Sequence, residues 1–270
     1  MSTVAWARLT IAADQVDDIE AVRKSTANRL RSLTIPVEIP KSGITIDKAG
    51  EGTPEAIALA SQLEVFQMAE KTAVLELNRA MRAHPLSGWV KEGMGVGTKS
   101  VARLLGSIGD PASRYDPEAE EVVERTVGQL WSYCGYGDAE KQKRRKGVQS
   151  NWNSEAKMRV HIIADAAFKP RCESCVEQGA TLREEGEAGW SSPPADCTCE
   201  ADGYTYRVEY EESRKADAAL DIADGHKHNR ALRKVKKLFL KNLWLEARRV
   251  QLTDGTHSAS DPSRTPEAVA

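Results

Sequence analysis

A glycine-containing step between two helical patterns constrains the fold of this chain more than any other feature. Residues 89–111 read WVKEGMGVGTKSVARLLGSIGDP, with Gly95 and Gly97 on either side of Val96. Glycine permits positive φ and lets the backbone approach a ligand closely, so these residues favour a tight turn with Val96 anchored in the core. The apolar face of the helix that follows is formed by Ala102, Leu104, Leu105 and Ile108. The segment therefore predicts a helix-hairpin-helix.

The start of the second helix has the chemistry of a phosphate site. Its first backbone N–H groups lack an intrahelical acceptor, and the helix dipole favours an anion there. Thr98 and Lys99 add a hydroxyl and a charge, and Arg103 lies about one turn further on. We expect contacts to a DNA backbone from Gly95, Val96, Gly97, Thr98, Lys99 and Arg103. The alternative interpretation is a purely structural turn.

Other segments also predict helices. Thr53 and Pro54 have the residue types of an N-cap and a first helical position. They precede an apolar stripe of Leu59, Leu63, Phe66, Ala69, Ala73, Leu77 and Met81. The stripe fits either a coiled coil, through which the N-terminal helices of two copies would form a homodimer, or core packing inside a bundle. Further helices are predicted over residues 11–33, 126–136, 150–169 and 229–251, and a linker or small hairpin over 35–54. Asn151 or Asn153 is the predicted N-cap of the helix over 150–169.

The predicted fold is mainly α. It is a helical bundle with a helix-hairpin-helix DNA-binding core, long N-terminal helices and a small inserted zinc knuckle. The predicted units are an N-terminal helix and linker (1–52), a long helix (53–85), the helix-hairpin-helix domain (86–169), a zinc-binding insertion (170–203), a basic helical region (204–251) and a tail with the composition of disorder (252–270).

The overall charge balance excludes a wholly basic, chromatin-type protein. The chain has 38 Lys and Arg against 40 Asp and Glu, a formal net charge of −2. With 40% hydrophobic residues, its 270 residues can bury a core of ordinary size. The sequence has neither a run of about 20 apolar residues nor the residue order of a signal peptide, so we expect a cytoplasmic protein with no membrane segment.

Basic residues are nevertheless concentrated in two segments. Between residues 141 and 169 eight Lys and Arg face two acids, and between 227 and 249 nine face only Glu246. Such segregation is the electrostatic signature of phosphate binding. We expect DNA contacts from Lys143, Arg144, Arg145, Lys146, Trp152, Asn153, Lys157 and Arg159. Trp152 could alternatively cap the core rather than stack on a base.

Four of the five cysteines form two closely spaced pairs. Cys172 and Cys175 have the spacing of a zinc knuckle, and Cys197 and Cys199 are one residue closer than usual. The intervening segment has few large apolar residues, so a bound metal would be its main source of order. We predict a structural Zn²⁺ held by these four thiolates, with a redox dithiol or incidental cysteines as alternatives. Cys134, on an apolar helix, is predicted to lie in the core.

Several segments, taken in order, resemble the C-terminal domain of DEDD-type insertion-sequence transposases. They are the hairpin with its second helix and Gly109-Asp110-Pro111, residues 130–136 (LWSYCGY), and residues 147–153 (GVQSNWN) followed by Met158 and Arg159. The resemblance spans residues 86–169, with a weaker match over 225–249. It implies a DNA-binding module of phage or mobile-element origin whose partner is duplex or branched DNA, with structured RNA as the alternative.

Two departures from that family bear on catalysis. Its members begin with a RuvC-like domain carrying four metal-binding carboxylates, whereas residues 1–85 predict helices. The family's nucleophilic serine has no equivalent within residues 138–146, and Ser150 lies just beyond. We therefore expect a DNA-binding protein first. The alternatives are a DNA strand-transfer recombinase that uses Ser150 or Ser132 as nucleophile, and a zinc-stabilised interaction module with no nucleic-acid role.

Overall fold

The structure is a computed structural model that describes residues 3–39, 44–46, 50–93, 95–138, 140–143, 146–184 and 190–253. Over these residues the chain is mainly helical, as predicted, and its strands form two small antiparallel hairpins. Predicted DNA contacts at Arg144 and Arg145 and the tail from residue 254 onward lie outside the described residues. No helix in the described part of the chain combines the length and the apolar character needed to cross a membrane.

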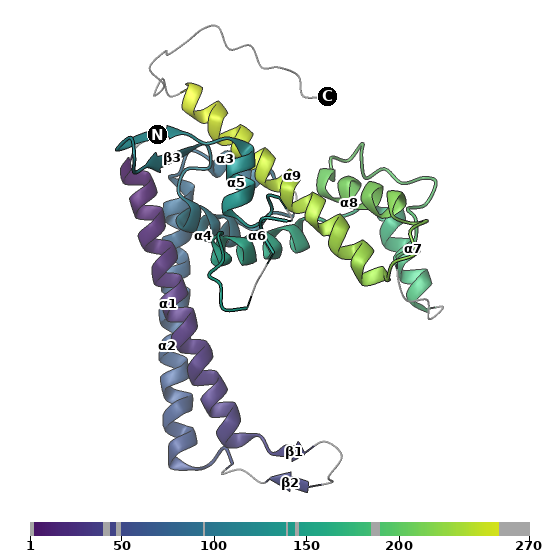
Figure 1. The fold of residues 1–270 in the computed structure, drawn as a ribbon. Coiled ribbons are helices and arrows are strands. Elements are labelled where there is room, and N and C mark those ends of the chain that lie inside the picture. The colour runs from purple at the N-terminus through teal and green to yellow at the C-terminus, as the bar shows by residue number, and fades with distance from the viewer. Residues whose placement is uncertain are drawn as a thin grey trace, which may run out of the picture.

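Two long antiparallel helices form an arm that projects from the rest of the molecule (Figure 1). They are α1 (Thr3–Thr34) and α2 (Pro54–Arg82), and a β-hairpin of β1 (Val37–Ile39) and β2 (Ile44–Ile46) lies at the tip. The predicted N-cap is confirmed, since the Thr53 side chain accepts a hydrogen bond from the Ala56 N–H. The two helices pack on each other within one chain, so the predicted apolar stripe of α2 serves intramolecular packing at least at Ala73, Leu77 and Met81.

The body of the molecule is built from α3 (Ser87–Glu92), α4 (Thr98–Ile108), α5 (Val127–Tyr133), α6 (Ser154–Ala167) and α9 (Asp224–Thr253). The helix α9 crosses the body and packs on both α5 and α6 (Figure 1). Its buried face includes Val235, Phe239 and Leu243. The buried residues of the arm, the hairpin region and α9 form one continuous apolar cluster, so core contacts cross the predicted unit boundaries.

A β-hairpin and a helix in the cysteine segment were not predicted. The strands β3 (Ser113–Asp116) and β4 (Glu121–Glu124) pair as an antiparallel hairpin, and Trp244 Nε1 donates a hydrogen bond to the Arg125 carbonyl just after it. The helix α7 (Glu173–Glu184) lies within the cysteine segment, and α8 (Thr205–Ala216) follows that segment and packs on α9. The predicted core position of Cys134 is confirmed, because its side chain is fully buried.

Candidate metal centre and nucleic-acid interface

Four cysteine sulfurs converge at one point and could hold a metal ion. The Sγ atoms of Cys172, Cys175, Cys197 and Cys199 all lie within 4.8 Å of one another. The Cys172–Cys197, Cys175–Cys197 and Cys175–Cys199 sulfur pairs are 3.8, 3.5 and 3.9 Å apart. These separations exclude disulfide bonds, in which the two sulfurs are about 2 Å apart. They match a tetrahedral thiolate site, where Zn–S bonds of about 2.3 Å place the sulfurs about 3.8 Å from each other.

The local fold explains how the two pairs meet. Cys172 immediately precedes α7 and Cys175 lies in its first turn, so one helical turn brings both sulfurs to the same side. The second pair lies in the loop before α8, and the Cys172 N–H donates to the Cys199 Sγ at 3.3 Å. Tyr204 and Val208 pack against the cysteines, which form a cluster separate from the main core.

The surroundings of the cysteines shift the pKa values of their thiols in different directions. Burial raises the pKa of Cys199 to about 11 and also raises the pKa of Cys175. Burial acts in the same direction on Cys172, but hydrogen bonds from the backbone around Cys175 and Thr198 outweigh it and lower the pKa of Cys172 to about 6. A divalent metal would replace the protons on such thiols. The donor set of four sulfurs fits zinc better than a hard cation such as Mg²⁺.

The predicted glycine hairpin joins α3 to α4, with Val96 8% exposed against the core. Gly95 adopts positive φ (+75°), and a Cβ there would lie 2.8 Å from the Pro170 Cγ. Gly97 has an ordinary φ of −75° and serves as the N-cap of α4, with no side chain capping the helix. The two glycines therefore have different roles: Gly95 allows the close turn, and Gly97 leaves the first amides of α4 uncapped by a side chain.

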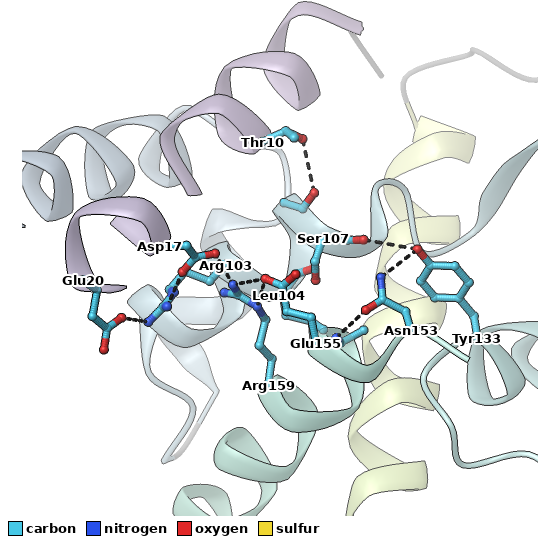
Figure 2. A network of polar contacts seen from close by, with 12 residues as sticks. Thr10, Asp17, Glu20, Arg103, Leu104, Ser107, Tyr133, Asn153, Glu155 and Arg159 are labelled. Carbon is cyan, nitrogen blue, oxygen red and sulfur yellow. Dashed lines mark hydrogen bonds and ion pairs between the residues drawn. The ribbon is translucent and has the colours of Figure 1, made fainter. Parts of the chain in front are cut away.

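Two predicted DNA-contact arginines instead take part in ion pairs that join the arm to the body (Figure 2). Arg103 on α4 pairs with Asp17 and with Glu20 on α1, the latter at 2.7 Å. Arg159 on α6 is only 5% exposed and pairs with Asp17 and Glu155. Because both guanidinium groups are engaged and largely covered, these residues stabilise the fold at the positions where we expected phosphate contacts. Lys99, one turn before Arg103, lies 3.5 Å from Glu70 of α2.

Asn153 also has a structural role. Its side chain caps α6 by accepting the Ala156 N–H at 2.9 Å, which confirms the predicted N-cap, and it donates to the Tyr133 hydroxyl at 3.1 Å (Figure 2). Trp152, just before it, is half-buried, and the Lys157 Nζ lies 4.4 Å from its ring centroid. Gly135 lies under the same indole, because a Cβ on Gly135 would be 2.9 Å from the Trp152 ring.

The loop between α5 and α6, together with α6 and α9, lines a cleft of about 1010 Å³, which we call the basic cleft. Its lining includes four lysines, one acid, one tyrosine, one tryptophan and two serines: Lys141, Lys143, Lys157, Lys236, Glu140, Tyr136, Trp152, Ser150 and Ser154. Lys157 and Lys236 both approach the Tyr136 ring, with Nζ to centroid distances of 5.9 and 5.5 Å. Burial lowers the pKa of Lys236, and the neighbouring positive charges of Lys157 and Arg233 lower it further.

Of the predicted basic-segment residues, the structure brings Lys143, Trp152 and Lys157 together in this cleft. Lys146 is exposed on the loop, outside the cleft lining. Sequence reasoning missed Tyr136 and Lys236 as cleft residues. The basic character of residues 227–249 was a signal for Lys236, but only the packing of α9 on α6 places that lysine beside Lys157.

Comparisons with known proteins give no further assignment. No family model matches the chain, and neither the curated proteins nor the solved structures contain a match to it.

Proposed function

We propose that this protein binds nucleic acid, with DNA as the primary target, through the basic cleft and the glycine hairpin. The transposase resemblance of residues 86–169 agrees with this proposal. In it the chain is a transposase-derived or mobile-element module that holds the phosphate backbone and carries no complete nuclease site of its own.

The observation that carries the proposal is the lysine cluster of the basic cleft. Four lysines and a single acid line one cavity, and that acid, Glu140, is engaged by Lys143 at 2.7 Å. Burial, and after it the positive charges of Lys157 and Arg233, lower the pKa of Lys236, so this lysine lies in a positively charged surrounding. A bound phosphate would offset that positive charge, and each neutralised phosphate would release a counterion, so binding would depend strongly on salt.

The glycine hairpin supplies a second contact point. Gly97 caps α4 without a side chain, so the first amides of the helix are available to an anion. The hairpin contacts Ala167 and Pro170 at the C-terminal end of α6, whereas Trp152 and Asn153 precede the N-terminal end. The 14 residues of α6 separate the two contact points by about 20 Å. A single nucleotide cannot span this distance, so the arrangement favours a polymer over a mononucleotide.

The cysteine cluster has a structural role in this proposal. Zinc held by Cys172, Cys175, Cys197 and Cys199 would tie the start of α7 to the loop before α8. The small apolar contribution from Tyr204 and Val208 agrees with a segment that needs a metal to stay folded. Zinc with four thiolate ligands has no open position for substrate, so it would not act in catalysis.

The test is fluorescence-anisotropy titration of the zinc-loaded full chain with duplex, branched and single-stranded DNA and with structured RNA, at increasing salt. We expect affinity to fall steeply with salt. Lys141→Ala with Lys143→Ala should weaken binding to every sequence and reduce the salt slope by about 2. The control is Lys215→Ala, which removes one lysine charge from an exposed site on α8 away from the basic cleft and should leave binding nearly unchanged. Absence of binding to all four probes at low salt would overturn the proposal in favour of an interaction module.

One observation favours a second candidate function, DNA strand transfer. Ser150 lines the basic cleft together with Lys157, and its hydroxyl lies 3.3 Å from the Trp152 carbonyl oxygen. Ser132 lines a neighbouring pocket instead. A serine nucleophile among phosphate-binding lysines is the arrangement that a recombinase would need, with metal-binding carboxylates supplied by another protein. If this function holds, Ser150→Ala abolishes strand transfer and leaves DNA affinity unchanged, while Ser154→Ala, in the same cleft, changes neither.

A further inference from the structure

The helix α2 carries a second apolar stripe that nothing in the described chain covers. Ile57, Val65, Met68 and Leu75 are between 56% and 63% exposed. They lie on the side of the helix away from the stripe that faces α1, because Val65 is about half a turn from Leu63, and Met68 is about half a turn from Phe66 and Leu77. Figure 1 shows that the arm projects from the body, and the exposed fractions show that these four side chains are accessible.

The spacing of this outer stripe is that of a coiled-coil seam. Ser61 and Thr72 are exposed and fall between the apolar positions, so the stripe reads 61, 65, 68, 72 and 75 in alternating steps of four and three. Ile57 extends it one turn toward the N-terminus of α2. Isolated exposed apolar residues need no explanation, but four at a helical repeat on one projecting arm indicate a contact surface.

The stripe is complementary to itself when a second copy runs in the opposite direction. In an antiparallel pair of identical helices, the numbers of two facing residues add up to nearly the same sum at every position. With that sum near 133, Val65 meets Met68 of the second copy and Ile57 meets Leu75. The two polar positions, Ser61 and Thr72, meet each other in the same register. Every apolar residue of the stripe is therefore matched with another apolar residue.

The charges beside the stripe fit the same register. Glu64 and Lys71 flank the seam on one side, are exposed, and have no ion pair within the described chain. In an antiparallel coiled coil, flanking residues on the same side of the seam pair across the interface, which places Glu64 of one copy beside Lys71 of the other, and the reverse. In a parallel pair each of these flanking residues would instead meet the residue five positions on in the other copy, so Glu64 would lie beside Ala69 and have no charged partner there.

We propose that the outer face of α2 is the interface of an antiparallel homodimer, with Val65 and Met68 at its centre. The dimer would place the two bodies at opposite ends of a pair of crossed arms. This inference does not depend on nucleic-acid binding, because neither the basic cleft nor the hairpin lies on this face.

The first test is the mass of the full chain in solution, measured by sedimentation equilibrium over a wide concentration range. We expect a dimer whose dissociation constant rises at least tenfold in Met68→Glu. The control Val122→Glu changes an apolar residue that is 70% exposed on β4 and should leave the mass unchanged. A monomer at all concentrations, or a dimer unaffected by Met68→Glu, would overturn the proposal.

The second test addresses orientation and does not depend on the apolar substitutions. Lys71→Glu should weaken the dimer by placing two acids together, and Glu64→Lys combined with Lys71→Glu should restore it. Cysteines introduced together at positions 57 and 75 should cross-link two chains, whereas each alone should not, because equivalent positions are about 27 Å apart along an antiparallel pair. Efficient cross-linking by the single variants would show a parallel dimer and overturn the proposed register.

Discussion

Arg159 on α6 pairs with Asp17 on α1, although the two residues are 142 positions apart in the chain. The same carboxylate also accepts from Arg103 on α4, so Asp17 joins the arm to two helices of the body (Figure 2). Arg159 is 5% exposed, and such a charge is tolerated only with its partners in place. The orientation of the arm therefore depends on a polar network as well as on apolar packing.

Replacing Asp17 with Asn should lower the free energy of unfolding by about 2 kcal/mol, because Arg159 and Arg103 lose a charged acceptor while keeping Glu155 and Glu20. Urea unfolding followed by circular dichroism measures the change. Asp18→Asn is the matched control, since Asp18 is the exposed neighbour, and its effect should stay within about 0.5 kcal/mol. Equal effects of the two substitutions would show that the network contributes nothing specific.

Replacing each of the two hairpin glycines with serine should change the stability of the fold in opposite directions. Gly95→Ser places a side chain at φ +75° and against Pro170, so we expect a loss of about 2 kcal/mol in stability. At Gly97 the φ is ordinary and the nearest atom to a new Cβ is 3.8 Å away. A serine there can cap α4, and stability should rise by a few tenths of a kcal/mol.

Gly97→Ser also tests the proposed role of the hairpin in binding. The serine hydroxyl would accept a hydrogen bond from a backbone N–H that we propose binds phosphate. Affinity for DNA should therefore fall although the fold becomes more stable. The comparison is made by thermal unfolding and anisotropy on the same preparation. Unchanged affinity in a more stable Gly97→Ser protein would remove the hairpin from the interface and leave the basic cleft as the contact.

If the proposed zinc site is correct, the purified protein should carry one zinc ion per chain, measurable by elemental mass spectrometry. Cys172→Ser should abolish stoichiometric zinc and lower the melting temperature, because the bound metal would tie α7 to the loop before α8. Cys134→Ala serves as the control: it removes a fully buried thiol from the main core, so it should reduce stability while leaving the zinc content at one. Retention of zinc by Cys172→Ser would contradict the assigned ligand set.

Local sequence signals predicted much of this architecture, and long-range pairing explains most of what they missed. The caps at Thr53 and Asn153 and the buried Val96 follow from residue types next to each other in the chain. The partners of Arg103 and Arg159 lie 86 and 142 positions away, and no local pattern marks them. Because the sequence gives no sign of these acidic partners, both arginines were predicted to contact phosphate.

The missed β-hairpin has a different cause. Its strands have the sequences SRYD and EVVE, which are short, half of charged residues and without a fully buried position, so they lack the alternation of a half-buried strand. The helix α7 was missed because its segment is poor in apolar residues and its packing depends on the cysteines. Convergence of the four sulfurs was predictable from spacing, whereas the basic cleft required the packing of α9 on α6.

His84 should make stability depend on pH. Its ring is 1% exposed, lies edge-on to Trp6 at 4.3 Å between centroids, and accepts the Leu86 N–H at Nδ1. Burial lowers the pKa of His84 from 6.5 to about 4, so between these values the unfolded chain binds a proton that the folded chain does not. Stability should therefore fall as the pH decreases from about 6.5 to about 4, by up to about 3 kcal/mol.

The substitution that isolates this effect is His84→Asn, because the asparagine side-chain oxygen can accept the hydrogen bond from the Leu86 N–H and asparagine has no titratable group. Urea unfolding between pH 4 and pH 7 should give a flatter dependence for this variant than for the parent chain. His226→Asn, at an exposed position at the start of α9, should keep the parent's slope. If His84→Asn and the parent lose stability equally on acidification, the dependence arises from other groups, and His84 binds its proton equally well in the folded and the unfolded chain.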